Sequence, residues 1–273
     1  MITPELTKYV VLVTGGTRGF GKAVALEFAR TGASVVVTHR WGSADEDELL
    51  EEFQREGAPT PTIVECDVSD EDANRELLAA IRSRHGKLDV IISNVAFAKV
   101  TKELEDLQRQ SLELSLRYSA WPVVELVQLT HEVLGRFPRY VVAISSDGGE
   151  VCHLGYDFAG AAKATLETLV RYLSVRLKSE GVRVNVLRPG FMDTASSRAV
   201  LGDATVDALA GSPLIVDPRQ AARACLALCS GWMDAVTGQV IVADGGASLL
   251  GPTRFVSAPA ALAADPSSGT PQQ

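Results

Sequence analysis

The chain has 273 residues and a formal net charge of −8 at pH 7. This length suits one large α/β domain or two small ones. An acidic surface repels polyanions, so the charge argues against nucleic acid and anionic membranes as partners and favours a small molecule.

The chain shows no pattern typical of a membrane or secreted protein. No apolar run approaches the ~18 residues of a membrane span, and the first residues, "MITPELTKYVVLVTGG", lack the basic and apolar regions of a signal peptide. The four cysteines include no Cys-x-x-Cys pair, which makes a metal site improbable. We therefore expect a cytoplasmic protein with reduced thiols and no metal.

Short apolar runs rich in β-branched residues alternate with helical patterns along the chain. We expect strands over residues 9–14, 34–38, 62–66, 88–93, 140–145, 183–187 and 239–242. Nearly continuous apolar strands between amphipathic helices indicate a parallel sheet covered on both faces. The sequence thus predicts an α/β protein: one doubly wound Rossmann domain of about seven parallel strands over 1–250. A Pro/Ala/Ser-rich tail that we expect to be mobile follows over 251–273.

The first predicted strand runs into "TGGTRGFG", residues 14–21, and then into a helical pattern. Glycines let a backbone approach a pyrophosphate, and the helix N-terminus offers free N–H groups. A tight strand-to-helix connection without a ligand is the alternative. The position at the end of the first strand favours a dinucleotide site made by Gly15, Thr17, Arg18, Gly19, Phe20 and Gly21.

The end of the second predicted strand, "VVVTHRW", bears on the choice of cofactor. An acidic residue there would bind the ribose 2′-hydroxyl, whereas an arginine accommodates a 2′-phosphate. Arg40 follows His39 at this point, and Arg18 lies in the glycine loop. Two guanidinium groups suit a dianionic phosphate, so we predict NADPH as the cofactor. The alternative is that Arg40 is a solvated loop residue.

Several motifs give the chain a resemblance to the short-chain dehydrogenase/reductase family from about residue 10 to residue 250. They are "TGGTRGFG", "CDVSD" at 66–70, "ISS" at 144–146, Lys163, "RVNVLRPGFMDT" at 183–194 and "GQVIVADGG" at 238–246. The resemblance implies that Asp67 and Val68 flank the adenine and that Thr194 reaches the nicotinamide end. It adds Asn94, Pro189 and Gly190 to the cofactor site.

The resemblance also implies a homotetramer, or at least a homodimer. In that family two long helices, equivalent here to residues 112–134 and 158–180, pack across a twofold axis.

The chain departs from the family pattern at the catalytic end. Ala159 stands where the family tyrosine is expected, thirteen residues after Ser146, and Ser115 replaces an asparagine of the family's proton relay. Tyr156, however, precedes Lys163 by seven residues. Positions four and seven apart share one helix face. If the helix extends back to Tyr156, its phenol is presented along the lysine's face, one turn before the vacant site.

The Tyr-x6-Lys spacing resembles that of the enoyl-acyl-carrier-protein reductases within the family. The resemblance implies hydride transfer to the β-carbon of an enoyl thioester, with Tyr156 stabilising the enolate and Lys163 binding the nicotinamide ribose. Ser146 would add a hydrogen bond, or is a strand-end hydroxyl satisfied by the backbone. The substrate would be a small molecule or a carrier-bound acyl chain.

Two other functions remain open at this point. In a ketone or carbonyl reductase acting on a polyketide-like substrate, Tyr156 would protonate a ketone oxygen; the missing relay asparagine counts against this function. A catalytically silent cofactor-binding protein would explain the lost tyrosine; the retained Lys163 counts against it.

Overall fold

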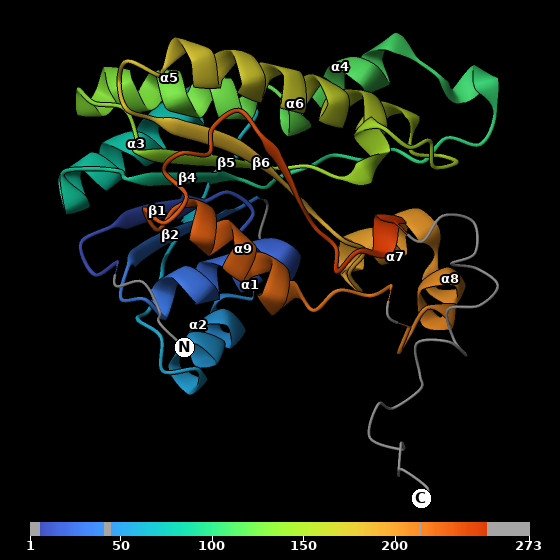
Figure 1. Ribbon diagram of the computed structural model, residues 1–273, viewed down its shortest axis with the longest axis horizontal. Helices are drawn as coiled ribbons and strands as arrows, with labels where there is room; N and C mark the ends of the chain where they lie inside the picture. Colours follow the sequence, from blue (N-terminus) through green and yellow to red (C-terminus); the bar gives the residue numbers. More distant parts are fainter. Residues whose placement is uncertain (1–5, 41–44, 213, 250–273) are drawn as a thin grey trace, which may run out of the picture.

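The core of the protein is a seven-stranded parallel sheet with the strand order β3-β2-β1-β4-β5-β6-β7 (Figure 1). This computed structural model describes residues 6–40, 45–212 and 214–249. The strands are β1 (Val10–Val13), β2 (Ser34–His39), β3 (Thr62–Glu65), β4 (Val90–Ser93), β5 (Tyr140–Ile144), β6 (Arg183–Pro189) and β7 (Val240–Ala243). The predicted fold class and the seven strands are confirmed.

Helices cover both faces of the sheet because its central strands are apolar on both sides. One layer contains α1 (Gly19–Ala29), α2 (Glu46–Arg55) and α9 (Pro218–Leu228). The opposite layer contains α3 (Glu71–His85), α4 (Arg109–Ser119), α5 (Pro122–Leu134) and α6 (Asp157–Arg176). Each layer packs its own buried cluster against the sheet, and every residue of β1 and β4 is buried.

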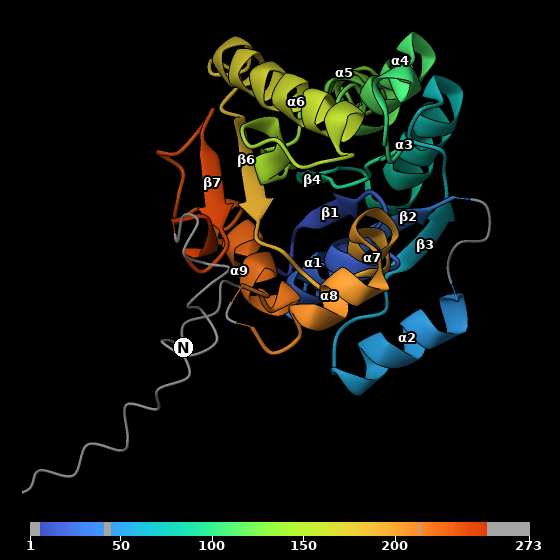
Figure 2. The same cartoon turned by 90° about the vertical axis from the view of Figure 1, so that its right-hand side faces the viewer.

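The short elements lie at the carboxyl ends of the strands. They are the 3₁₀ turns η1 (Leu104–Asp106) and η2 (Asp147–Gly149) and the helices α7 (Ala195–Leu201) and α8 (Asp203–Ala208). Figure 2 shows α7 and α8 beside the end of β6 and the start of α1.

One predicted helix is broken in the structure. The expected helix over 112–134 is divided into α4 and α5, with Pro122 as the first residue of α5. Proline lacks the N–H that a continuous helix needs and clashes with the preceding turn, so the chain restarts there. The other expected long helix, over 158–180, ends at Arg176.

The strand order locates the functional crevice. Connections run one way from β1 to β3 and the other way from β4 to β7, so the order reverses between β1 and β4. Ligands of doubly wound sheets bind at this point, outside the carboxyl ends of the strands.

Other expectations concern disulfides, metals, membranes and the tail. All four cysteines are free thiols. Within the described residues there is no cluster of three metal-binding side chains and no helix with the length and apolar character of a membrane span. The expected tail over 251–273 lies outside the described residues.

Candidate active site

The glycine loop joins β1 to α1 by a close backbone approach. A Cβ atom on Gly21 would lie 2.3 Å from the carbonyl oxygen of Gly15, so only glycine fits this contact. The Gly15 N–H donates to Thr38 Oγ1 at 3.2 Å, which ties the loop to β2. The start of α1 therefore directs its free N–H groups, including that of Gly19, toward the crevice.

Asn94 supports this loop from β4. Its Nδ2 donates to the carbonyl oxygens of Thr14 and Gly15, at 3.0 and 3.2 Å. Asn94 thus stabilises the backbone conformation of the glycine loop. Phe20 has a similar supporting place, because its side chain is buried in the core cluster beneath α1.

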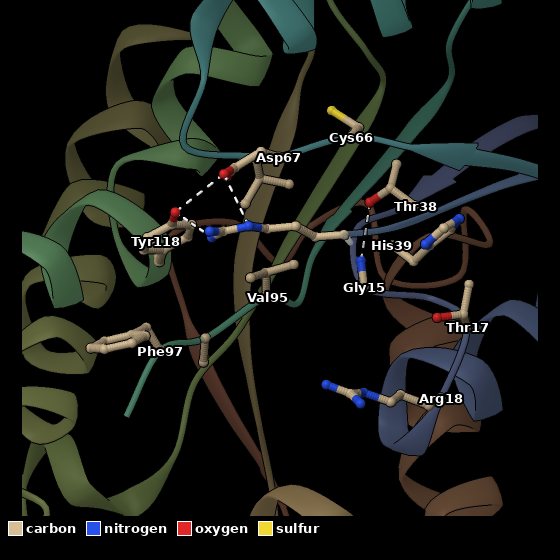
Figure 3. Close-up of a pocket in the computed structure, with 13 residues that line it drawn as sticks. Gly15, Thr17, Arg18, Thr38, His39, Cys66, Asp67, Val95, Phe97 and Tyr118 are labelled. Carbon is tan, nitrogen blue, oxygen red and sulfur yellow. Dashed lines mark hydrogen bonds and ion pairs between the residues drawn. The ribbon is translucent and has the colours of Figure 1, made fainter. Parts of the chain in front are cut away.

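A cavity of about 350 Å³ opens at the carboxyl ends of β1, β2, β3 and β4 (Figure 3). Residues of five segments line it: Gly15, Thr17, Arg18, Thr38, His39, Arg40, Cys66, Asp67, Val68, Val95, Ala96, Phe97 and Tyr118. Seven of the residues that the sequence assigns to the cofactor site are among them. The cavity and the glycine cradle fit a dinucleotide.

Arg40 directly follows β2, and its side chain reaches Asp67 and, on α4, Tyr118. Its Nε lies 3.1 Å from Asp67 Oδ2, and its Nη1 donates to the hydroxyl of Tyr118. Its guanidinium carbon also lies 4.9 Å from the centre of the Tyr118 ring, in cation–π range. Arg40 is therefore engaged within the cavity wall rather than extended into solvent.

Asp67 completes this group by accepting from the Tyr118 hydroxyl at 3.2 Å. Burial alone would raise the pKa of Asp67, but hydrogen bonds from Ser69 and Tyr118 and the charge of Arg40 hold it below its usual value. Asp67 is thus a carboxylate at neutral pH, and it offers an acceptor at the end of β3.

Two further basic side chains border the same cavity. Arg18 is exposed and projects from the glycine loop toward the open space (Figure 3). No carboxylate pairs with it among the residues that the structure describes. His39 is buried, and its Nε2 lies 3.4 Å from Glu46 Oε1. Arg18 and Arg40 therefore bring two guanidinium groups to the ends of β1 and β2, and that of Arg40 is paired with Asp67.

The segment after β6 brings the other predicted cofactor residues to the crevice. Pro189 ends β6, and Gly190 is packed so tightly that a Cβ there would lie 2.8 Å from the Cα of Asp244. Thr194 caps α7 by accepting from the Ser197 N–H at 3.1 Å. A Cβ on Gly19 would lie 3.8 Å from Thr194 Cγ2, so α7 starts beside the glycine loop.

The predicted catalytic residues meet at the end of β5. The hydroxyl of Tyr156 lies 3.3 Å from Ser146 Oγ, and Lys163 Nζ donates to the carbonyl oxygen of Ile144 at 2.7 Å. Helix α6 begins at Asp157, with Tyr156 as its N-cap residue, and the Tyr156 carbonyl accepts from the Gly160 N–H at 2.7 Å. The helical residues of α6 therefore start at Asp157, and Tyr156 takes part in the helix only as its cap.

Burial changes the acid–base properties of two of these groups. It lowers the pKa of Lys163 to about 8, while the charge of Glu167 acts in the opposite direction. It raises the pKa of the Tyr156 phenol above its usual value, although the hydrogen bond with Ser146 opposes this. At pH 7 the lysine is thus mostly an ammonium and the tyrosine a neutral phenol.

The ring of Tyr156 lies directly against η2. A Cβ on Gly148 would come within 2.5 Å of the Tyr156 ring carbons Cδ1 and Cε1. Ala159, where the family tyrosine is expected, is only 3% exposed. The ring at position 156 therefore fits against its neighbours, whereas the Ala159 side chain is already enclosed by surrounding residues.

Ser115, at the position of the relay asparagine, is completely buried in α4. Its hydroxyl has no hydrogen-bond partner among the described residues. A serine is too short to reproduce the contacts of an amide at this position.

The sequence and structure of the chain have many relatives. A family model described as enoyl-(acyl carrier protein) reductase matches residues 15–248. The short-chain dehydrogenase/reductase FrzI of Cladobotryum sp is 30% identical over 89% of this chain and 97% of its own length. The chain belongs to the short-chain dehydrogenase/reductase family.

Two relatives within this short-chain dehydrogenase/reductase family are named as reductases of unsaturated acyl thioesters. The 1-cyclohexenylcarbonyl-CoA reductase of Streptomyces collinus is 29% identical over 95% of this chain and 94% of its own. The NADH-dependent enoyl-[acyl-carrier-protein] reductase FabI of Aquifex aeolicus is 28% identical over 88% and 91%.

Solved structures of the same family share the fold. A short-chain dehydrogenase/reductase from Burkholderia xenovorans has a TM-score of 0.79 at 28% identity, covering 90% of this chain and 98% of its own. The Aquifex aeolicus enoyl reductase structure has a TM-score of 0.77, covering 89% and 98%. Members of this family are oxidoreductases that bind a nicotinamide cofactor.

Sequence reasoning assigned no role to Tyr118, although its side chain joins Arg40 and Asp67. Tyr118 lies three residues after Ser115 on α4, a spacing that puts both near one helix face. That spacing was the available signal. Phe97, whose ring centre lies 6.0 Å from that of Tyr118, was also assigned no role.

Proposed function

We propose that the protein is an NADPH-dependent reductase of α,β-unsaturated thioesters. The observation that carries this proposal is the pairing of Tyr156 with Ser146, 3.3 Å apart at the end of β5, close to the anchored Lys163. This pairing gives the chain a hydroxyl group for catalysis despite Ala159.

The roles of the residues follow from their charges. A bound nicotinamide cofactor supplies a hydride to the β-carbon of the substrate. The neutral phenol of Tyr156 then donates a hydrogen bond to the thioester oxygen, where negative charge develops as the enolate forms. Ser146 supports the phenol oxygen, and the Lys163 ammonium holds the nicotinamide ribose and favours negative charge nearby.

The preference for NADPH rests on the basic cavity wall. Arg18, Arg40 and His39 all lie at the ends of β1 and β2, where a 2′-phosphate would be held. The Aquifex aeolicus relative is named for NADH, so the choice of cofactor is a property to be measured for each chain.

The test measures cofactor oxidation at 340 nm with crotonyl-CoA and with cyclic ketones, each with NADPH and with NADH. We expect turnover of crotonyl-CoA with NADPH. Turnover of ketones alone would favour the carbonyl reductase, for which the same Ser146–Tyr156 pair would protonate a ketone oxygen. Binding of NADPH without turnover of either class would favour the catalytically silent protein.

We also propose that the chain is a cytoplasmic homotetramer or homodimer. On α6, Tyr172 and Val175 are 66% and 75% exposed, large values for an aromatic and a β-branched side chain. A shallow groove beside them is lined by Ala164, Thr165, Thr168 and Leu169. Light scattering at micromolar concentration tests this assembly, and a monomer would contradict it.

A further inference from the structure

A buried ion pair lies behind the catalytic hydroxyls and has no part in the proposed reaction. Arg188, on β6, grips Glu167, on α6: its Nε lies 2.7 Å from Oε1 and its Nη2 lies 2.6 Å from Oε2. Their side chains are only 7% and 6% exposed. Removing two charges from water is costly, and an apolar pair of similar size often gives equal stability. Stability alone therefore gives little reason for this pair.

The ion pair continues a series of contacts between β5 and α6. Ile144, Ser145 and Ser146 follow one another in the chain. The Ile144 carbonyl accepts from Lys163, the Ser145 hydroxyl donates to Glu167 Oε1 at 2.7 Å, and the Ser146 hydroxyl faces Tyr156. The helix partners at 156, 163 and 167 are spaced by seven and four residues, which puts them on one face. Glu167 thus helps to hold the catalytic strand end against the catalytic helix.

Arg188 also reaches the loop beneath Tyr156. Its Nη1 lies 2.7 Å from Glu150 Oε2. Glu150 directly follows η2, the turn whose Gly148 lies against the Tyr156 ring. One guanidinium therefore connects β6 with α6 and with the residue that follows η2.

The same residues, Glu167 and Arg188, also set the charge near Lys163. Glu167 lies one helical turn from Lys163, and both of its carboxylate oxygens are taken up by Arg188 and Ser145. The buried residues of α4, which packs on α6, are serines and carry no charge. The charged or titratable side chains that face this region are Asp147 with His153, Glu150, Tyr156, Glu167 and Arg188. Arg188 is the cation that balances Glu167.

We propose that Arg188 and Glu167 are positioning residues of the active site: they fix Ser146 and Tyr156 in place, and Arg188 offsets the negative charge of Glu167 beside Lys163. This proposal rests on the proposed function only in that Lys163 contacts a bound nicotinamide cofactor.

The test measures the affinity for NADPH by fluorescence titration between pH 6 and pH 10. Because the pKa of Lys163 is about 8, we expect affinity to fall as the pH rises through that value. Glu167→Gln removes a negative neighbour and should move the midpoint down by about one pH unit. Arg188→Gln leaves Glu167 unbalanced and should move the midpoint up by a similar amount. The double variant should return toward the wild-type midpoint.

A matched control removes an arginine from another largely buried carboxylate. Arg30 pairs with Glu27 in α1, in the opposite helix layer. Arg30→Gln should lower thermal stability without moving the midpoint. Shifts of the same sign in both single variants, or no shift in either, would overturn the proposal. A wild-type chain that binds neither NADPH nor NADH would instead contradict the proposed function.

A second variant keeps the proposal testable if Arg188→Gln does not fold. Arg188→Lys retains the positive charge but cannot grip Glu167 and Glu150 together. We expect an unchanged midpoint for NADPH binding and a kcat about tenfold lower, since the catalytic hydroxyls lose their alignment. A wild-type kcat in Arg188→Lys would show that Arg188 does not position them.

Discussion

The two ends of the crevice are built in different ways. At the cofactor end, the backbone of the glycine loop is shaped by positions within one short motif, such as Gly15 and Gly21. At the catalytic end, side chains from separate segments have to meet, as Ser146 after β5 and Tyr156 before α6 do. A backbone site tolerates little change in sequence, whereas a side-chain site can shift its acid by one helical turn, as long as the oxygen reaches the same place.

The largest expected effect is at the catalytic end. Tyr156→Phe should retain the fold and NADPH binding but reduce turnover by ~10²–10⁴-fold, because the thioester oxygen loses its positioned hydrogen-bond donor. Steady-state kinetics with crotonyl-CoA and a fluorescence titration with NADPH give the two readouts. Full activity would mean that another group is the acid.

The Tyr156→Phe variant also provides a rescue experiment at position 159. Restoring the family tyrosine by Ala159→Tyr should not recover turnover, because position 159 is 3% exposed and its phenol would enter one turn further along α6. Recovery of turnover would show that the acid can act from either turn.

The next largest effect is at the cofactor end. Arg40→Asp should weaken NADPH binding by about 1–3 kcal/mol, or up to ~10²-fold, with a much smaller loss for NADH. The dissociation constants of both cofactors are compared by fluorescence. Arg55→Asp, at the end of α2 and outside the cavity, is a control for charge reversal. Equal losses for both cofactors would place the 2′-phosphate elsewhere.

A smaller effect tests whether the free space at Gly148, in η2, is needed to keep the Tyr156 ring beside Ser146. Gly148→Ala should lower kcat by about tenfold with little change in NADPH affinity, since its Cβ would push the Tyr156 ring off Ser146. The matched control is Gly149→Ala, whose Cβ would meet the Ala164 nitrogen at 3.2 Å and no atom of Tyr156 among its nearest neighbours. Equal losses in kcat would indicate a general disturbance of η2.

The smallest effect concerns Tyr118. Tyr118→Phe removes the hydroxyl between Arg40 and Asp67 but retains the ring. We expect a change of about threefold in the ratio of NADPH to NADH affinity, close to the net value of one hydrogen bond. An unchanged ratio would show that Tyr118 does not orient Arg40.

Most of the fold and about half of the site can be predicted from the sequence, because those parts depend on local sequence patterns. The strands are nearly continuous apolar runs, and the glycine loop is one contiguous motif, so both are visible without tertiary contacts. The break at Pro122 was missed because the expected helix over 112–134 followed the family resemblance and not the proline in this sequence. The partnership of Arg188 with Glu167 depends on how β6 packs against α6, which local sequence patterns do not encode.

The contact between Gly148 and Tyr156 restricts how this active site can change by mutation. Because the ring fills the space that a Cβ at 148 would need, the two positions form one coupled unit rather than two independent sites. A side chain at 148 and the aromatic ring at 156 compete for the same space, so a substitution at one position changes what the other position can hold. An engineer who moves the acid back to position 159 must therefore repack three positions together.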